Sequence, residues 1–226
     1  MAKAVLTVWC DVVPEHEDAF NVWYNDEHIA ERVAIPGIRS GQRYVAEIGN
    51  PKYLAWYEVD DVGVLTSPSY RQALDTPSAQ TSAVMPHFRN MVRTACSVRA
   101  AAGDATQRAP WVATLRVSAS EDKDEALGAW LAETALPHIA ESAQILSAQL
   151  WRGDHAASAT PGTAEAKMRG APDRMIDWAV LIEAESAEAA GRVHDQHLSP
   201  DALLAHGASS GGEFGVYRLI KSLSET

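Results

Sequence analysis

His28 is the side chain in this sequence best suited to acid–base chemistry. It follows Glu27 near the end of a segment with helical periodicity, residues 17–28. The dipole at a helix C-terminus favours the protonated imidazole, and a histidine that titrates near neutrality can both take and return a proton. The alternative is structural: His28 caps the helix or hydrogen-bonds the loop at Pro36 and Gly37.

Two expected strands supply a second group of candidates. Alternation predicts that Trp9 and Asp11 line an interior, because the other face of the strand at residues 4–12 is purely apolar. The strand at residues 111–118 turns Arg116 to the same side. A guanidinium opposite an aromatic wall suits a carboxylate or an enolate. The alternative for Arg116 is a structural ion pair with Asp11 or another carboxylate.

Tyr44 and Gln42 share one face of a further expected strand, residues 38–47. A phenol can donate to a developing oxyanion, although a tyrosine in a sheet can equally be core with its hydroxyl at the rim. His87 lies just before another expected strand, and it too can be either functional or structural. We therefore expect catalysis from His28, Tyr44 and Arg116, and substrate contacts from Trp9, Asp11, Gln42 and His87.

The sequence carries no motif of a common cofactor or metal. A glycine-rich dinucleotide motif, a P-loop and an H-E-x-x-H motif are all absent. His194 and His197 lie three apart on an expected helix, but no carboxylate or cysteine completes a recognisable metal site. We expect no cofactor and no metal. Haem stays open, because one histidine suffices to bind it and leaves no spacing signature.

The chain repeats itself, which indicates how these residues are positioned. Val5–Val45 aligns with Val112–Arg152 without a gap, and the identities include Trp23 with Trp130. We name this correspondence the repeat alignment. Such self-similarity predicts duplication of one structural unit. His28 falls on Ala135, so the unit does not require a histidine there. We therefore expect the main cavity beside His28.

Each half predicts the order βαββαβ, a ferredoxin-like unit whose sheet needs cover on its free face. Two such sheets packed face to face make an α/β barrel, so the expected fold is α+β, with tandem ferredoxin-like units forming an intramolecular dimeric-type barrel. The expected units are residues 1–100 and 109–226, joined by the Ala/Gly-rich stretch 100–108. Residues 154–173, rich in Ala, Ser, Thr, Gly and Pro, predict a mobile loop.

Several motifs resemble a known family. Phe20-Asn21-Val22-Trp23-Tyr24-Asn25-Asp26-Glu27-His28, then Ile35-Pro36-Gly37 and Arg43-Tyr44, resemble the F-x-x-W-Y-x-x-E-H…P-G…R-Y pattern of EthD-like dimeric α/β-barrel proteins. Met85-Pro86-His87-Phe88-Arg89-Asn90 resembles a recurring segment of uncharacterised members. The resemblance covers roughly the first half of the chain, and the second half only through the repeat. It implies the barrel fold but no single activity, since the superfamily includes muconolactone isomerases, polyketide cyclases, cofactor-free monooxygenases and haem enzymes.

Composition narrows the partners. The formal net charge is −11 and no Lys/Arg cluster occurs, which argues against nucleic acid. No apolar run approaches the length of a membrane-spanning helix and the N-terminus does not resemble a signal peptide, so we expect a soluble cytoplasmic protein without a membrane partner. Cys10 and Cys96 lie in apolar runs, as buried thiols do. A small-molecule substrate and a possible homodimer complete these expectations.

Three functional hypotheses follow. The first is a cofactor-independent isomerase, lyase or cyclase that acts on an aromatic or lactone-like carboxylate, with His28 as general acid–base, Tyr44 and Arg116 holding the oxyanion and Trp9 stacking on the substrate. The second is a haem-binding barrel enzyme. The third is a non-catalytic or stress-related barrel that holds a small ligand.

Overall fold

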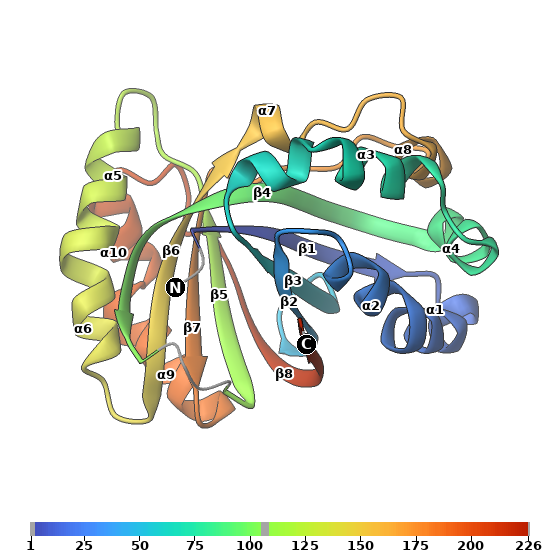
Figure 1. Cartoon of the computed structure of the whole chain (residues 1–226). Coiled ribbons are helices and arrows are strands. Elements are labelled where there is room, and N and C mark those ends of the chain that lie inside the picture. The colour runs from blue at the N-terminus through green and yellow to red at the C-terminus, as the bar shows by residue number, and fades with distance from the viewer. Residues whose placement is uncertain (1–2, 105–108, 226) are drawn as a thin grey trace.

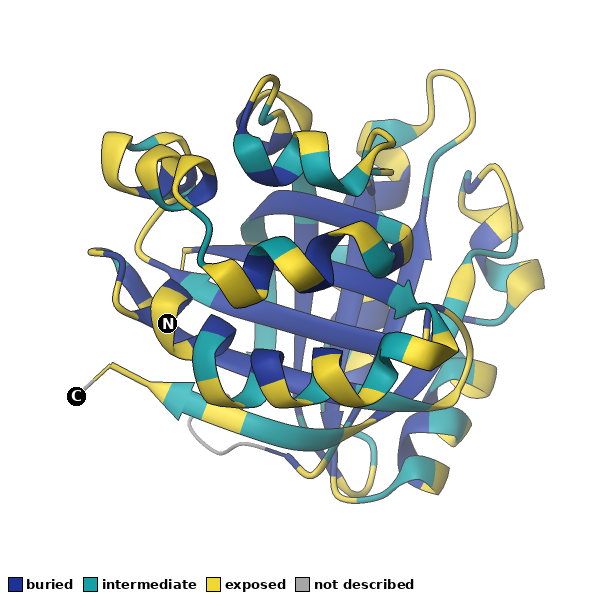
Figure 2. Ribbon diagram, turned by 90° about the vertical axis from the view of Figure 1, so that its right-hand side faces the viewer, coloured by how far each residue is buried: buried dark blue, intermediate teal, exposed yellow. Residues whose placement is uncertain are grey.

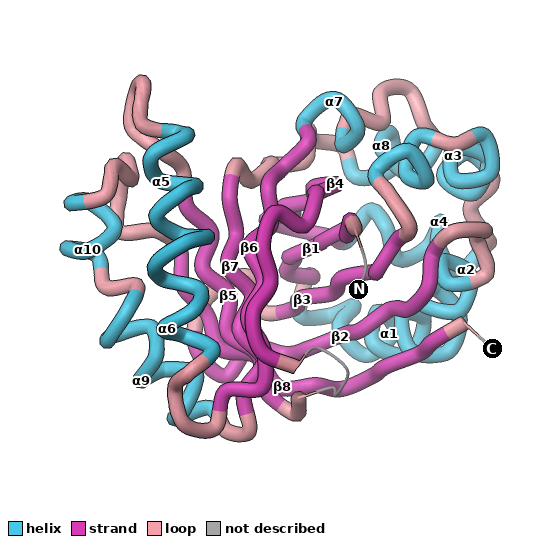
Figure 3. Tube along the Cα trace, turned by 60° about the vertical axis from the view of Figure 1, so that its left-hand side comes forward, coloured by secondary structure: helices cyan, strands magenta, loops and turns pink. Residues whose placement is uncertain are grey.

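The strands close into one antiparallel barrel. The computed structural model describes residues 3–104 and 109–225, and around the barrel the strands follow the order β1-β3-β2-β8-β5-β7-β6-β4 (Figures 1 and 3). The strands are β1 Ala4–Val12, β2 Ile38–Ile48, β3 Tyr53–Val59, β4 Phe88–Gly103, β5 Trp111–Val117, β6 Ile145–Asp154, β7 Trp178–Ala184 and β8 Glu213–Ser224.

The two halves of the chain meet along two seams of the barrel. At one seam β2 pairs with β8, where Tyr44 lies opposite Leu219. At the other β4 pairs with β6, where Val98 lies opposite Trp151. Both sheets of the duplication therefore share one continuous hydrogen-bonded wall, and the expected fold of tandem ferredoxin-like units in an intramolecular barrel is confirmed. The unit bounds 1–100 and 109–226 stay a prediction.

Helices cover the barrel in two layers, one over the strands of each half, and the two short helices within residues 155–169 of the second half lie in the layer over the first half (Figure 1). Their buried sides face the strands and their exposed sides face solvent (Figure 2). The helices are α1 Glu17–Trp23, α2 Ile29–Val33, α3 Pro68–Asp75, α4 Ala79–Val84, α5 Asp124–Trp130, α6 Leu136–Ala140, α7 His155–Ser158, α8 Ala164–Arg169, α9 Ala187–His197 and α10 Pro200–Ala205.

Strand alternation divides the buried residues as the sequence predicts. Leu6 and Val8 pack beneath the first helical layer, whereas Trp9 packs with Tyr44 and Trp56 inside the barrel. The interior is therefore a third, aromatic-rich core. Its side chains fill much of the space in which we expected a cavity.

The duplication is visible in detail. Trp23 and Trp130 are the last residues of α1 and α5, and each is followed by one π-helical turn, Tyr24–His28 and Leu131–Ala135. Matching hydrogen bonds run from Ser40 Oγ to Glu58 Oε2 and from Ser147 Oγ to Glu183 Oε2, both 2.7 Å long. The repeat alignment thus corresponds to a structural equivalence.

The hairpin connections break the symmetry. In the first half a short turn joins β2 to β3, whereas residues 155–177 join β6 to β7 and include α7 and α8. We name residues 155–177 the insert. The segment expected to be a mobile loop, 154–173, includes two helices that pack beside α3 and over β4 (Figure 1). Of the expected connector 100–108, residues 100–103 belong to β4, and 105–108 lie outside the described residues.

No helix in residues 3–104 or 109–225 has the length and apolar character needed to cross a membrane.

Candidate functional site

His28 lies within the first helical layer and not at the barrel mouth. The π-helical turn Tyr24–His28 runs directly into α2, so the histidine is in the middle of a continuous helical segment. The residue is 7% exposed, and its ring centroid lies 4.2 Å from that of Trp23 and 5.0 Å from that of Tyr24. The expected C-terminal position is therefore wrong. The structural alternative is not observed either, because His28 neither caps a helix end nor forms a hydrogen bond with the loop at Pro36 and Gly37.

The surroundings of His28 favour its neutral form. Arg32 Nε donates to His28 Nε2 over 3.5 Å, while Nδ1 has no hydrogen-bond partner among the described residues and lies 3.9 Å from Glu31 Oε2. Burial is the main cause that holds the pKa of His28 well below 6.5, and the positive charges of Arg32 and Arg43 lower it further. The expectation that the helix dipole favours protonated His28 is therefore also wrong.

A small cavity of about 30 Å³ lies between His28 and the outer face of β1. One wall carries two buried phenols, with Tyr57 Oη donating to Tyr24 Oη over 3.1 Å. The other walls carry apolar side chains, three arginines, the phenol of Tyr70 and the carboxylate of Glu165. The lining consists of Leu6, Val8, Tyr24, His28, Arg32, Tyr57, Tyr70, Leu74, Met85, Phe88, Met91, Arg93, Glu165 and Arg169.

The insert supplies the one carboxylate among these described lining residues. Glu165 of α8 is 3% exposed and forms an ion pair with Nη2 of Arg32, which is 4% exposed. Arg169, also from α8, lies 4.0 Å from Glu165 and pairs more closely with Asp173, with both nitrogen–oxygen distances 2.9 Å. The second half of the chain thus completes a site built on the first half.

A third guanidinium anchors the insert. Arg93 of β4 donates to the carbonyl of Ser158 over 2.9 Å and to Tyr70 Oη over 2.7 Å. The Ser158 hydroxyl in turn accepts from the backbone N–H of Ala95 over 2.9 Å. The described lining therefore holds three guanidiniums, from Arg32, Arg93 and Arg169, against the carboxylate of Glu165. Such a site favours an anionic ligand.

A larger cavity of about 390 Å³ adjoins the His28 cavity. Both are lined by Phe88, Met91 and Arg169, and residues 170–174 of the insert form much of the larger one. The His28 cavity alone has room only for water, since ligand pockets usually measure ~300 Å³ or more. Displacing Met91 and Arg169 would join the two spaces into one of suitable size.

The remaining catalytic candidates lie across the sheet from His28. Tyr44 is inside the barrel, stacked on Trp56 with ring centroids 4.7 Å apart. Gln42 also points inward and donates to Ser40 Oγ over 2.9 Å. Arg116 lies beside Trp9, as the alternation predicts, but its ion-pair partner is Glu213 and not Asp11. The structure does not bring Tyr44, Arg116, Trp9 or Gln42 to the histidine.

Asp11 and His87 have local structural contacts. The Asp11 carboxylate accepts from the backbone N–H of Lys52 and from Asn90 Nδ2, each over 2.7 Å, and so ties two turns to the end of β1. His87 stacks on His16 with centroids 3.3 Å apart. Neither residue lines the His28 cavity. These contacts offer no support for the expected substrate-binding roles.

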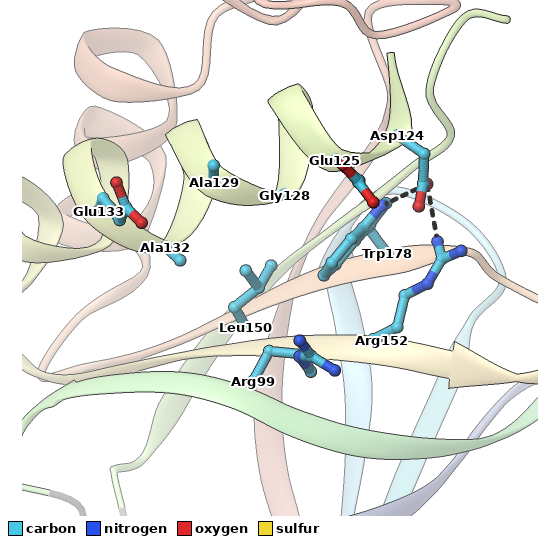
Figure 4. A pocket seen from close by; sticks show the side chains of 10 residues that line it. All are labelled: Arg99, Asp124, Glu125, Gly128, Ala129, Ala132, Glu133, Leu150, Arg152 and Trp178. Atoms are coloured by element: carbon cyan, nitrogen blue, oxygen red, sulfur yellow. Dashed lines mark hydrogen bonds and ion pairs between the residues drawn. The ribbon is translucent and has the colours of Figure 1, made fainter. Parts of the chain in front are cut away.

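The described residues have a roomier cavity in the second half, of about 460 Å³, against α5 (Figure 4). The expectation that the main cavity adjoins His28 is therefore wrong. Gly128, Ala132 and Leu150 line it, and the repeat alignment places them on Asn21, Asn25 and Arg43.

Those first-half residues form a packed network. Arg43 donates to Asn25 Oδ1 over 2.9 Å and to Asn21 Oδ1 over 2.6 Å, and its guanidinium lies 4.6 Å from the Tyr24 ring centroid. The smaller residues of the second half leave that space empty. The two helical layers thus differ because the first copy has the arginine network and the second has Gly128, Ala132 and Leu150 at the equivalent positions.

Sequence reasoning missed Arg32, Arg93 and Glu165. Arg32 carried a usable signal, because the repeat alignment pairs it with Ile139 just as it pairs His28 with Ala135. Glu165 carried none, since it lies in a segment without a counterpart in the first half. No cluster of His, Cys, Asp or Glu suited to a metal ion occurs in the part of the chain that the structure describes.

No protein-family model matches the sequence, and no curated protein is similar enough to be matched. Solved structures do match it along nearly its whole length. The chain has a dimeric-type α/β-barrel fold. An anthrone oxidase-like protein superposes with a TM-score of 0.67 at 9% identity, covering 99% of this chain and 93% of that one. A proposed monooxygenase of Fusobacterium nucleatum gives 0.61 at 9% identity, covering 99% and 95%. A heme-binding protein of Thermus thermophilus gives 0.53 at 12% identity, covering 97% and 92%. At these identities the similarity establishes the fold alone.

Proposed function

We propose that the protein is a small-molecule enzyme that moves a proton on an anionic, enolisable substrate at His28 and needs no cofactor. The observation that carries the proposal is a buried, neutral imidazole beside guanidiniums that outnumber the carboxylates in the described lining around them. The reaction class is isomerase or lyase, and the substrate class is an aromatic or lactone-like carboxylate. We place the protein among EthD-like barrels of the cytoplasm, without nucleic-acid or membrane partners and with a homodimer as its possible assembly.

The unprotonated nitrogen of neutral His28 is Nε2, which accepts from Arg32 Nε in this structure, so Arg32 must turn away before Nε2 can accept a substrate proton. Transfer creates an imidazolium and an enolate together, and Arg32 is close enough to stabilise the enolate's charge. The low pKa of His28 makes it a weak base, so the substrate must have an acidic C–H, as a carbon next to a carbonyl has. The same imidazolium then returns the proton to another carbon or to a leaving group.

Arg32 takes the role that the sequence suggested for Arg116. The Glu165 carboxylate already occupies its Nη2 in the closed site. A substrate carboxylate or enolate would replace Glu165 when the insert moves outward. Tyr24 and Tyr57 give the pocket an aromatic wall, against which an aromatic substrate can pack.

A haem does not fit this arrangement. Tyr24, Tyr57 and Tyr70 are each at most 3% exposed and fill the layer between helix and sheet, so a macrocycle would have to displace several of them. A small substrate would need movement only of the insert and of Met91. The described lining of the 460 Å³ cavity in the second half contains no His, Cys, Met or Tyr, and therefore offers no axial ligand.

Exchange of substrate hydrogen in D₂O tests the proposal without knowledge of the product. We would incubate the protein with a panel of aromatic and lactone-like carboxylates and follow deuterium incorporation by mass spectrometry. His28→Ala should slow exchange by about 100-fold or more, the usual scale of general acid–base catalysis. The fold should survive, because alanine occupies the equivalent position 135.

His87→Ala is the matched control, because His87 lies outside the cavity. It should leave exchange unchanged, while Arg32→Met should reduce it strongly. Binding without exchange by any panel member would favour the non-catalytic barrel, and a Soret band on the purified protein would favour the haem enzyme. Exchange that persists in His28→Ala would refute the assignment of the base.

A further inference from the structure

Hydrogen-bond donors without acceptors gather at one end of the barrel interior. Arg116 is 5% exposed, and its Nη2 donates to the carbonyl of Asn50 over 2.6 Å and pairs with Glu213 Oε2 at 2.8 Å. Its Nε and Nη1 have no partner among the described residues. The guanidinium carbon lies 5.0 Å from the Trp9 ring centroid, and Trp9 Nε1, also buried, has no partner there either.

Buried hydrogen-bond donors that lack an acceptor destabilise the folded protein. Leaving one unpaired costs ~1–3 kcal/mol, and more when the group is charged, so native proteins rarely leave several together. Arginine and tryptophan can only donate, so the missing partner must be an acceptor. Nothing else in the described neighbourhood of Arg116 supplies one to Nε and Nη1.

The two carboxylates in the described lining of this cavity are already engaged by other cationic side chains. Glu213 serves two guanidiniums, since Arg174 Nη2 lies 2.8 Å from its other oxygen, and the Glu213 side chain is half exposed. The other carboxylate among the described lining residues, Asp177, lies 3.3 Å from His155 Nε2. Arg116 is thus a buried cation whose ion-pair partner, Glu213, also pairs with Arg174.

Arg116 lines a cavity whose size limits the ligand. The space is about 120 Å³, and hydroxyl-bearing residues Ser118, Ser209 and Ser210 lie around it. This is well below the ~300 Å³ of pockets for larger organic ligands, but it exceeds the ~30 Å³ share of a single water molecule. An anion of a few non-hydrogen atoms matches this space.

We propose that this end of the barrel is a second binding site, which takes a small carboxylate of formate to acetate size on Arg116. The site is separate from the His28 cavity, with which it shares no lining residue in the described parts of the chain. Nε and Nη1 are enclosed in this structure, so the ligand would accept from them after the Arg116 side chain turns toward the cavity, and it would add the counter-charge that Glu213 supplies only in part. The inference does not depend on the proposed function.

Acetate titration of the wild-type protein tests the site directly. The indole N–H signal of Trp9, assigned by its loss in Trp9→Phe, should shift with saturation as sodium acetate replaces sodium chloride at constant ionic strength. The midpoint should lie below about 10 mM, a modest affinity for so small a ligand. Benzoate should bind at least about tenfold more weakly, because its ring exceeds the cavity.

Two variants and one control separate the site from general salt effects. Arg116→Met should abolish the saturable shift. If that variant does not fold, Ser118→Leu should abolish it by filling the cavity. His28→Ala should leave the acetate midpoint unchanged, whatever happens to deuterium exchange. A shift that follows chloride equally, fails to saturate, or survives in both Arg116→Met and Ser118→Leu would overturn the proposal and leave water as the acceptor.

Discussion

The ion pair between Arg32 and Glu165 should determine whether the insert stays docked. Both side chains are at most 5% exposed, and removing one partner of such a pair usually costs ~3–5 kcal/mol, because the other charge remains buried. We therefore expect Glu165→Ala to lower the free energy of unfolding by about 3 kcal/mol. With a urea m-value of ~2 kcal/mol/M, the midpoint would fall by roughly 1.5 M.

Urea denaturation followed by circular dichroism measures this loss. Part of it can take the form of local undocking of α8, so hydrogen exchange at the amides of Ala166 and Lys167 should accelerate as well. Arg32→Met combined with Glu165→Leu should recover to within ~1 kcal/mol of the wild type, since no unpaired charge remains. The matched control is Arg39→Ala, which breaks an exposed pair with Asp60. If Glu165→Ala changed the midpoint and the exchange rates no more than Arg39→Ala does, our account of the docked insert would be wrong.

Three further outcomes follow from the first helical layer. The pKa of His28 is below 6.5 in the folded state, so the unfolded chain binds a proton at this residue at a higher pH than the folded chain does. The wild type should therefore lose stability relative to His28→Gln as the pH falls below about 6.5. Urea midpoints of both proteins at pH 7.5 and pH 5 check this, and a difference between the two proteins that is the same at both pH values would contradict it. Arg43→Leu leaves the acceptors Asn21 and Asn25 unpaired and should cost about 3 kcal/mol in chemical denaturation, with partial recovery when Asn25→Ala is added. Gly41→Ala would place a Cβ 2.9 Å from both the Ile29 and Tyr57 side chains, so its melting temperature should fall clearly; an unchanged value would show that these side chains move freely.

The fold could be predicted from sequence because local signals and the repeat agreed. Strand alternation correctly separated Leu6 and Val8 from Trp9, and the repeat alignment correctly paired Trp23 with Trp130. Element ends were less accurate, and the short helix α4 was missed. Its six residues carry too few apolar positions for a periodic signal.

The site was harder to predict, because it depends on which side of the sheet each side chain meets. His28 and Tyr44 are both buried against the strands of the first half, but His28 lies on the outer face of the sheet and Tyr44 inside the barrel. A helix end cannot be distinguished from a π-helical turn by residue types alone, so the direction of the His28 pKa shift was also missed. The partner of Arg32 lies 133 positions away in the chain, in a segment whose composition indicated only a loop.

The closed wall of strands has a consequence for how this protein could have diversified. In a barrel assembled from two identical chains, every substitution or insertion appears twice. A segment that covers the site of one subunit therefore also covers the equivalent site of the other. Joining both units in one chain removes that constraint, and selection can act on each copy alone. Here one copy has the histidine and the arginine network, and the other carries a segment that contacts β4 and closes the site of the first copy. A first unit expressed alone would expose the edges of β2 and β4, pair with a second copy of itself, and leave two uncovered histidine sites in place of one covered site.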